Sequence, residues 1–180
     1  MLSVAFTGLD HIDLDCCKQR GIVVRNAAGY STTAVSELAI GLMLDVMRKI
    51  TELDAATRKG GSRGLFLGRE LRGKTVGVVG TGAIGTATIR LLLAFGCKVL
   101  AYSRTVRPDV VSLGVKYCPL DTLMKESDIV TLHVPLNKET THLIGKHELS
   151  LMKPSAILIN TARGNVVDIE ALALALKEIS

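Results

Sequence analysis

A glycine pattern that follows a valine-rich run constrains the fold of this chain more than any other feature. The run TVGVV (75–79) leads directly into GTGAIG (80–85), and a helix-like segment continues to about Phe95. In a strand–turn–helix of this kind the first glycine permits a tight turn and the second leaves room for a pyrophosphate beside the backbone. The third lets the helix pack closely against the strand. Glycines that only form a tight turn are the competing interpretation.

The spacing predicts a structural role for each residue of this pattern. Gly80 makes the turn, Gly82 faces the pyrophosphate, and Gly85 lies where the helix meets the strand. Ala83 and Ile84 begin the helix, so their N–H groups lack intrahelical acceptors and can bind the diphosphate. These five residues form the predicted diphosphate site.

Short apolar runs alternate with helix-like segments along the chain. The runs are nearly continuous rather than alternating, which is typical of strands buried on both faces of a parallel sheet. The expected strands span 3–6, 22–24, 75–80, 98–103, 115–117, 128–134 and 156–160. This repetition predicts an α/β fold with a Rossmann-like, doubly wound parallel sheet.

The longest helix is expected over residues 31–50. Ser31 or Thr32 can cap its start, and Arg48 and Lys49 suit the dipole of its last turn. Apolar residues occur at helical spacing over much of its circumference. We therefore expect this helix to be mostly buried.

Composition narrows the classes of partner. The net charge is +5, yet the basic residues are scattered except in the glycine-rich segment 58–74, which we interpret as a solvated connection. Aromatic residues make up 3% of the chain and Trp is absent, so stacking platforms for bases are missing. An anionic small molecule accounts for the charge at least as well, and we expect no nucleic-acid partner.

The sequence also bears on where the protein resides. No apolar run is long enough to span a bilayer, and the start of the chain lacks the basic and apolar regions of a signal peptide. The four cysteines, of which Cys16 and Cys17 are adjacent, show no CxxC spacing. We expect free thiols in a cytoplasmic protein that does not associate with membranes.

The end of the strand at 98–103 bears on the choice of cofactor. An NAD site normally has Asp or Glu there to bind the adenosine ribose, whereas this chain has Ser103 and Arg104, with Arg107 nearby. A hydroxyl and a guanidinium suit a 2′-phosphate. We therefore expect NAD(P) binding with a preference for NADP; the alternative is that Arg104 lies over the adenine of bound NAD.

Several blocks of the chain resemble the D-isomer-specific 2-hydroxyacid dehydrogenase family, which includes phosphoglycerate dehydrogenase and glyoxylate/hydroxypyruvate reductase. They cover nearly all of the chain in the order of the family. The blocks are FTGLDHIDLDCCKQRGIVV, GYSTTAVSELAIGLMLDVMR, GKTVGVVGTGAIG, DIVTLHVPLNKETTHLIG and LMKPSAILINTARGNVVD.

The resemblance implies two domains. Residues 1–29 would be the tail of a flavodoxin-like substrate-binding domain, and residues 30–180 an NAD(P)-binding domain that is incomplete at its C-terminal end. The GLD loop of the family offers backbone N–H groups to the substrate carboxylate, which here points to Thr7 and Gly8. Tyr30 matches a tyrosine that lines the substrate pocket, although a hinge tyrosine can also serve packing alone.

The resemblance assigns the LHVP block to the cofactor rather than to catalysis. It places His133, Val134 and Pro135 beside the adenosine and ribose, with Thr140 nearby. His142 and His147 lie in a polar stretch and are expected to be exposed. We expect no metal site.

Arg163, in the NTARG block, matches the active-site arginine of the family. A guanidinium can polarise the carbonyl oxygen of a 2-oxo acid while it holds the carboxylate, and the same residue borders the cofactor. The backbone of Thr161 and Ala162, at the carboxyl end of a strand, should face the nicotinamide. A loop arginine that forms a salt bridge without contacting substrate is the alternative.

The chain departs from the family pattern after this arginine. The family supplies an acid/base histidine and a glutamate beyond the NTARG block, but the 17 residues after Arg163 contain no histidine. The resemblance therefore implies a dehydrogenase fragment, which acts on a 2-oxo or D-2-hydroxy acid, has little activity alone and dimerises through helices such as 31–50. A dinucleotide-sensing binding protein similar to a corepressor, or a non-functional remnant, are the alternatives.

Overall fold

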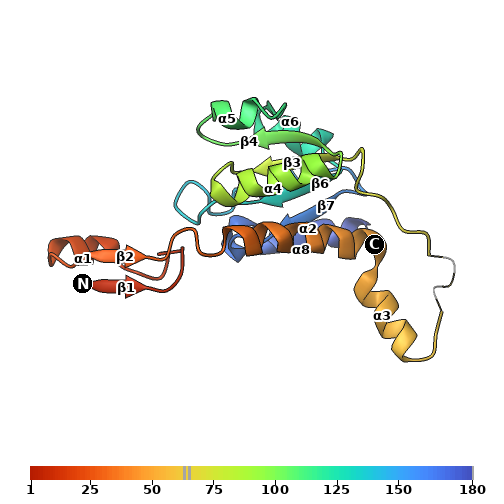
Figure 1. Ribbon diagram of the computed structural model, residues 1–180, viewed down its shortest axis with the longest axis horizontal. Helices are drawn as coiled ribbons and strands as arrows, with labels where there is room; N and C mark the ends of the chain where they lie inside the picture. Colours follow the sequence, from red (N-terminus) through yellow and green to blue (C-terminus); the bar gives the residue numbers. More distant parts are fainter. Residues whose placement is uncertain (63, 65, 180) are drawn as a thin grey trace.

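The computed structural model describes residues 1–62, 64 and 66–179. Arg63 and Leu65, in the predicted connection, and Ser180 lie outside the described residues. The main sheet is parallel, with the strand order β5-β4-β3-β6-β7 (Figure 1). Its strands are β3 (Thr75–Val79), β4 (Lys98–Tyr102), β5 (Lys116–Tyr117), β6 (Ile129–Leu132) and β7 (Ile157–Asn160). The strand that leads into the glycine motif, β3, is thus the central one, as a doubly wound sheet requires.

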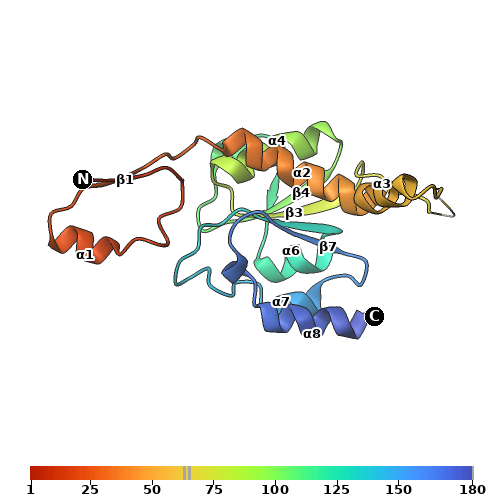
Figure 2. The same cartoon turned by 90° about the horizontal axis from the view of Figure 1, so that it is seen from below.

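Helices cover both faces of this sheet, which confirms the predicted fold class. In Figure 2, α2 and α4 lie on one face and α6, α7 and α8 on the other. The bounds are α2 (Thr32–Arg48), α3 (Ile50–Arg58), α4 (Ala83–Ala94), α5 (Pro108–Val111), α6 (Leu120–Glu126), α7 (Lys146–Leu151) and α8 (Ile169–Ile179), with a 3₁₀ turn at Gly164–Val166.

Two apolar clusters, one on each face, hold the layers together. On the first, Met43 and Met47 of α2 and Ile89 of α4 belong to one cluster with Val76 and Val78 of β3. On the second, Leu123 and Leu132 belong to the cluster beneath α6, α7 and α8. The strands are therefore buried on both sides, which explains why their sequences are nearly continuous apolar runs.

The amino ends of three strands are fastened together by one carboxylate. Asp128 accepts hydrogen bonds from the backbone N–H of Thr75 at 2.9 Å and from Nζ of Lys153 at 2.8 Å. Burial alone would raise the pKa of Asp128, but these two partners outweigh it and lower the pKa overall. The carboxylate thus stays charged and ties together the starts of β3, β6 and β7.

Residues 1–29, here called the N-terminal unit, fold beside the main sheet rather than into it. The unit contains β1 (Leu2–Val4), α1 (Leu14–Gln19) and β2 (Val24–Asn26), and its two strands pair in parallel. It extends from the end of the molecule that faces the carboxyl ends of the main strands (Figure 1). The chain then enters α2 at Thr32.

The expectation of a mostly buried helix at 31–50 is wrong in part. Ala39, Met43 and Met47 are buried, but Leu38 and Val46 are about half exposed. Only one side of α2 contacts α4 and β7, so the apolar residues on its other side have no cover within the described structure. The helix also ends at Arg48, and only Lys49 separates it from α3, a helix that the sequence did not reveal.

Candidate functional site

The parallel register brings four of the predicted blocks to one edge of the sheet. Val79 is level with Tyr102 on one side and with Leu132 on the other, and Leu132 is level with Asn160. The residues that directly follow these strands therefore lie in a row along the carboxyl edge. That row consists of Ser103, Gly80, His133 and Thr161.

The first and third glycines are required by close backbone packing. Gly80 has φ +96°, and a Cβ there would lie 2.7 Å from the carbonyl oxygen of His133. A Cβ on Gly85 would collide with the carbonyl oxygen of Gly80 and would also touch His133. A side chain at either position would force β3, β6 and α4 apart.

The second glycine faces open space instead. Gly82 precedes α4, and a Cβ built on it meets no atom within 4 Å. The N–H groups of Ala83 and Ile84 begin the same helix, where no earlier helical carbonyl can accept them. A diphosphate can thus approach the backbone where a side chain would block it, so these residues fit a dinucleotide cofactor.

A buried hydroxyl lies at the far end of the same edge. Oγ1 of Thr161 is buried and has no hydrogen-bond partner in the described part of the chain. Asn160 shapes the loop around it, because its side chain accepts from the N–H of Ala162 at 3.0 Å and donates to the carbonyl of Arg163 at 2.9 Å. An unpartnered buried hydroxyl is costly, so this position fits contact with a bound polar group.

The two arginines after β4 make different contacts. Arg104 is exposed and its Nη1 pairs with Glu139 at 2.7 Å. Arg107 instead reaches the glycine loop, where its Nη1 donates to the carbonyl of Thr81 at 3.3 Å while Asp109 holds its other edge. Sequence reasoning named Arg107 only as a neighbour; its contact with the glycine loop depends on a turn that the sequence did not reveal.

His133 is a packed and neutral residue in this structure. Burial lowers its pKa from 6.5 to about 4, and Nε2 lies 3.0 Å from Oγ1 of the buried Thr131. An imidazole with this pKa is uncharged at neutral pH and cannot serve there as a general acid. Its place beside the cofactor stays a prediction.

The loop after β6 is ordered by its own threonine. Oγ1 of Thr140 donates to the carbonyl of Pro135 at 2.5 Å and accepts from the N–H of Asn137 at 2.9 Å. Val134 also packs against the second apolar cluster. Thr140 therefore holds the shape of this loop from within.

Arg163 meets the N-terminal unit. Its Nε donates to the two carboxylate oxygens of Asp10 at 3.1 and 3.3 Å. Its Nη2 packs so closely on Gly8 that a Cβ there would collide with it. The structure thus brings together Arg163 and the loop predicted to bind the substrate carboxylate, although 153 positions separate Arg163 from Asp10.

The other candidate residues, Tyr30 and two histidines, are exposed. Tyr30 is 64% exposed at the start of the connection into α2. His142 and His147 are exposed, as expected. His147 forms, with Asp121 and Glu148, the one group with ligand-like spacing found in the described residues, and Glu148 already accepts from the N–H of Gly145 at 2.9 Å. No helix in the described ranges combines the length and apolarity needed to cross a bilayer.

The fold and this edge define a class. The sheet is parallel and doubly wound, and a glycine turn leads into a helix whose N-terminus is open. Loop residues line the carboxyl edge beside this turn. These features together define a dinucleotide-binding domain. Residues 40–180 match the family described as "D-isomer specific 2-hydroxyacid dehydrogenase, NAD binding domain". The chain belongs to this family.

Named relatives agree with that assignment. A glyoxylate reductase from Thermococcus litoralis is 49% identical over 180 residues, which cover 95% of this chain and 54% of the relative. A hydroxypyruvate reductase from Thermotoga maritima is 43% identical over 96% of this chain and 56% of its own length. The chain thus spans about half the length of these curated relatives.

A solved structure shows the same arrangement of elements. The D-lactate dehydrogenase from Aquifex aeolicus, complexed with NAD and lactic acid, superposes with a TM-score of 0.91 and 41% identity. The match covers 99% of this chain and 55% of that one. The structural similarity therefore extends over the N-terminal unit as well as the main sheet.

Proposed function

We propose that this chain supplies the cofactor site and part of the substrate site of an NAD(P)-dependent oxidoreductase. The reaction would interconvert a 2-oxo acid and a D-2-hydroxy acid. The observation that carries the proposal is the contact between Arg163 and the loop at Thr7–Asp10, at the edge where the glycine motif lies. The acids named for the similar reductases and for D-lactate dehydrogenase belong to this substrate class.

Each group at this edge has a specific task in the proposed reaction. The start of α4 holds the diphosphate, and the loop at Thr161 and Ala162 faces the nicotinamide. A bound nicotinamide cofactor supplies the hydride. Arg163 holds the substrate carboxylate and stabilises the negative charge that develops on the carbonyl oxygen, while the N–H groups of Thr7 and Gly8 bind the same carboxylate.

The protonation step lacks a described donor. In the described residues the guanidinium of Arg163 contacts Asp10 and the carbonyl of Ala162, and its backbone carbonyl accepts from the side chain of Asn160 and the N–H of Val166. None of these is a histidine, and the family resemblance places the acid/base histidine after this block. A general acid contributes about 10²–10⁴-fold in rate, so the 180-residue chain alone should turn over slowly.

A direct assay tests the proposed function. The purified chain is mixed with NADPH or NADH and with glyoxylate, hydroxypyruvate or pyruvate, and the loss of reduced cofactor is followed. We expect cofactor binding, visible as a raised melting temperature, together with little turnover. Absence of any cofactor-dependent stabilisation would contradict the assignment of the edge as a dinucleotide site.

The preference for NADP forms part of the proposal. Ser103 follows the end of β4, Arg104 is exposed beside it, and Arg107 already faces the glycine loop. Two guanidinium groups and a hydroxyl at this place favour a 2′-phosphate. Parallel titrations with NADPH and NADH decide the matter, and equal or tighter binding of NADH would contradict the preference.

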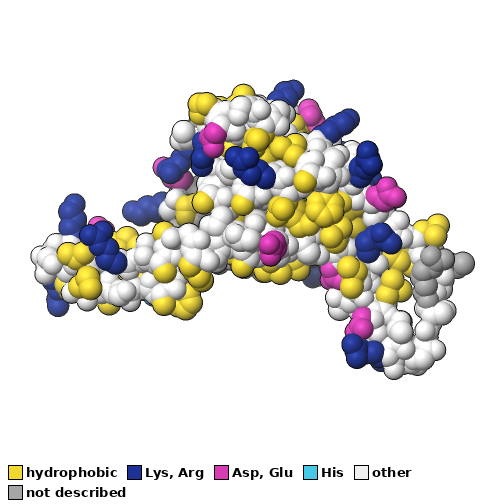
Figure 3. All heavy atoms as spheres, viewed as in Figure 1, with side chains coloured by type: hydrophobic (Ala, Val, Ile, Leu, Met, Phe, Trp, Pro, Cys, Tyr) yellow, Lys and Arg dark blue, Asp and Glu magenta, His cyan; other side chains and the backbone are white. Residues whose placement is uncertain are grey.

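We also propose the domain boundary and the assembly. The N-terminal unit would be the end of the substrate domain and residues 30–180 the cofactor domain. The exposed apolar side of α2, which includes Leu38, Leu42 and Val46, supports a homodimer through this helix. Figure 3 shows apolar side chains exposed over this part of the molecule. All four cysteines are free, which supports residence in the cytoplasm.

A further inference from the structure

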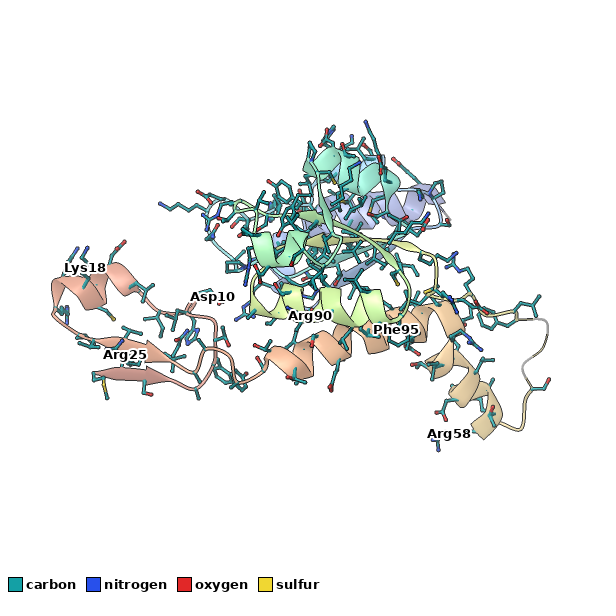
Figure 4. The ribbon with its side chains drawn as sticks, turned by 45° about the horizontal axis from the view of Figure 1, so that its top comes forward. Asp10, Lys18, Arg25, Arg58, Arg90 and Phe95 are labelled. Atoms are coloured by element: carbon teal, nitrogen blue, oxygen red, sulfur yellow. The ribbon has the colours of Figure 1, made fainter. Side chains whose placement is uncertain are left out.

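The side chain of Asp10 comes from the N-terminal unit and points toward the main sheet (Figure 4). Its carboxylate contacts Nε of Arg163, and its own backbone N–H, then the guanidinium, lower the pKa of the carboxyl despite partial desolvation. Asp10 is therefore ionised at neutral pH. The ion pair crosses between the N-terminal unit and the loop after β7.

The guanidinium has five N–H donors on a rigid plane, and the structure divides them. Nε is bound by Asp10, and Nη1 donates to the carbonyl of Ala162 at 3.1 Å. Nη2 lies against Gly8, where only the absence of a side chain leaves room. The edge that carries Nη2 is thus turned toward the loop at Thr7 and Gly8.

Both backbone N–H groups of that loop are available as donors. No acceptor is recorded in the described structure for the N–H of Thr7 or of Gly8. The loop is itself held, because Nδ2 of Asn26 donates to the carbonyl of Thr7 at 2.7 Å. Nη2 and these amides therefore form a set of donors to which the two structural units both contribute.

We propose that Asp10 is the residue that positions Arg163 for the 2-oxo acid. By holding Nε, Asp10 fixes the guanidinium with Nη2 beside the carboxylate-binding loop. This proposal rests on the function proposed above. The Arg163 side chain is 44% exposed, and arginine has many rotamers, so without a fixed partner it would sample many orientations.

Asp10 also brings a negative charge near the proposed anionic ligand, and charge alone would give it the opposite role. If Asp10 merely competed for Arg163, its neutralisation would strengthen ligand binding. If it positions Arg163, neutralisation weakens binding. The sign of the effect separates the two roles.

The test uses the full chain with saturating NADH and oxamate, an unreactive amide analogue of 2-oxo acids, in isothermal titration. We expect Asp10→Asn to weaken oxamate binding by about 10-fold, with NADH binding unchanged, since one charge-assisted hydrogen bond is lost. Asp10→Glu should restore part of the affinity. Asp54→Asn, which removes a carboxylate from Nε of Arg58 on α3, is the matched control and should change oxamate affinity less than twofold.

A spectroscopic readout keeps the positioning role separate from the proposed function. In ¹H–¹⁵N spectra the Nε–H signal of Arg163, assigned with Arg163→Lys, should shift and exchange faster with solvent in Asp10→Asn but not in Asp54→Asn. Its position should also follow the titration of Asp10 as the pH is lowered.

Two results would overturn the inference. One is oxamate binding in Asp10→Asn that equals or exceeds that of the parent chain. The other is an Arg163 Nε–H signal that Asp10→Asn leaves unchanged. If the parent chain binds NADH but not oxamate, the proposed substrate site fails in this chain, and the Nε–H signal alone then decides whether Asp10 positions Arg163.

Discussion

At the scale of single residues, the glycine motif divides into two kinds of position. Gly80 and Gly85 are glycines because protein atoms occupy the space that a side chain would need, whereas Gly82 is surrounded by open space. The pattern itself predicted this division, because each spacing has a known steric task. The partner that fills the space beside Gly80 and Gly85, His133, belongs to another strand and could not be identified by the motif alone.

Alanine substitutions should separate these two kinds of glycine. Gly85→Ala forces Cβ into the carbonyl of Gly80 and should cost about 1–3 kcal/mol of stability. Gly82→Ala should change stability by less than about 1 kcal/mol but weaken NADH binding by about 10-fold or more, because its Cβ enters the diphosphate space. Urea unfolding and cofactor titration measure the two effects.

The control for both variants is Gly41→Ala, an exposed glycine within α2 whose added Cβ meets no atom. It should raise stability by about 0.5–1 kcal/mol and leave NADH binding unchanged. A Gly82→Ala variant that binds NADH normally would argue against a diphosphate at the start of α4.

The pKa of His133 predicts a loss of stability in acid. The folded pKa, about 4, lies below the ordinary value of 6.5, so between these values the unfolded chain takes up a proton that the folded chain does not. The contribution of His133 to the free energy of unfolding is therefore fully present above pH 6.5 and decreases as the pH drops toward 4. The loss from this group is at most about 3 kcal/mol. Urea unfolding across this range measures the change.

His133→Gln should flatten that part of the stability curve, whereas His142→Gln, at an exposed position, should leave it unaltered. An unchanged curve in His133→Gln would show that the acid sensitivity arises from other groups.

At the scale of elements, the strands of the main sheet were predicted well and the helix ends less well. Continuous apolar runs identify strands because both sheet faces are covered. The junction of α2 and α3 was missed, since it depends on Lys49 in the left-handed region at φ 50°, a conformation that lysine rarely adopts. The buried side of α2 was also overestimated, because periodicity identifies apolar positions but not the element that covers them.

The junction itself depends on Asp45. Its carboxylate accepts from the N–H of Thr51 at 2.8 Å and from the hydroxyl of the same residue at 3.0 Å, and so caps the start of α3. Asp45→Ala should cost α3 about 1 kcal/mol, seen as faster amide exchange in α3 but not in α4. Asp54→Ala, which removes an exposed ion pair with Arg58, should have the smaller effect. Equal effects of the two substitutions would contradict the capping role.

At the scale of the whole molecule, the candidate site combines segments that are far apart in sequence. The resemblance to a family named Arg163 and the loop at Thr7 and Gly8 as candidates, and these segments lie together in the structure, but the resemblance did not predict the ion pair with Asp10. Such a contact depends on how the N-terminal unit lies against the loop after β7, and no local pattern encodes that placement. The roles of these residues stay predictions until binding is measured.

The exposed apolar side of α2 predicts assembly at this scale. Val46→Glu places a charge on that side and should weaken self-association by at least about 10-fold, because a buried unpaired carboxylate is costly. Leu174→Glu, at a comparably exposed apolar position on α8, is the control and should leave the association state unchanged. Sedimentation velocity over a concentration series measures the difference, and dimers that persist in Val46→Glu would locate the interface elsewhere.

The carboxylate of Asp128 ties the strands at the end of the sheet opposite the glycine turn. The groups that fasten the strands and the groups proposed to bind ligands therefore occupy opposite ends of the same strands. If that proposal holds, mutations in the loops of one end should change ligand preference without weakening the anchor at the other. A library of variants confined to the loops at Thr7–Asp10, Ser103–Arg107 and Thr161–Arg163 would explore new specificities while most members still fold.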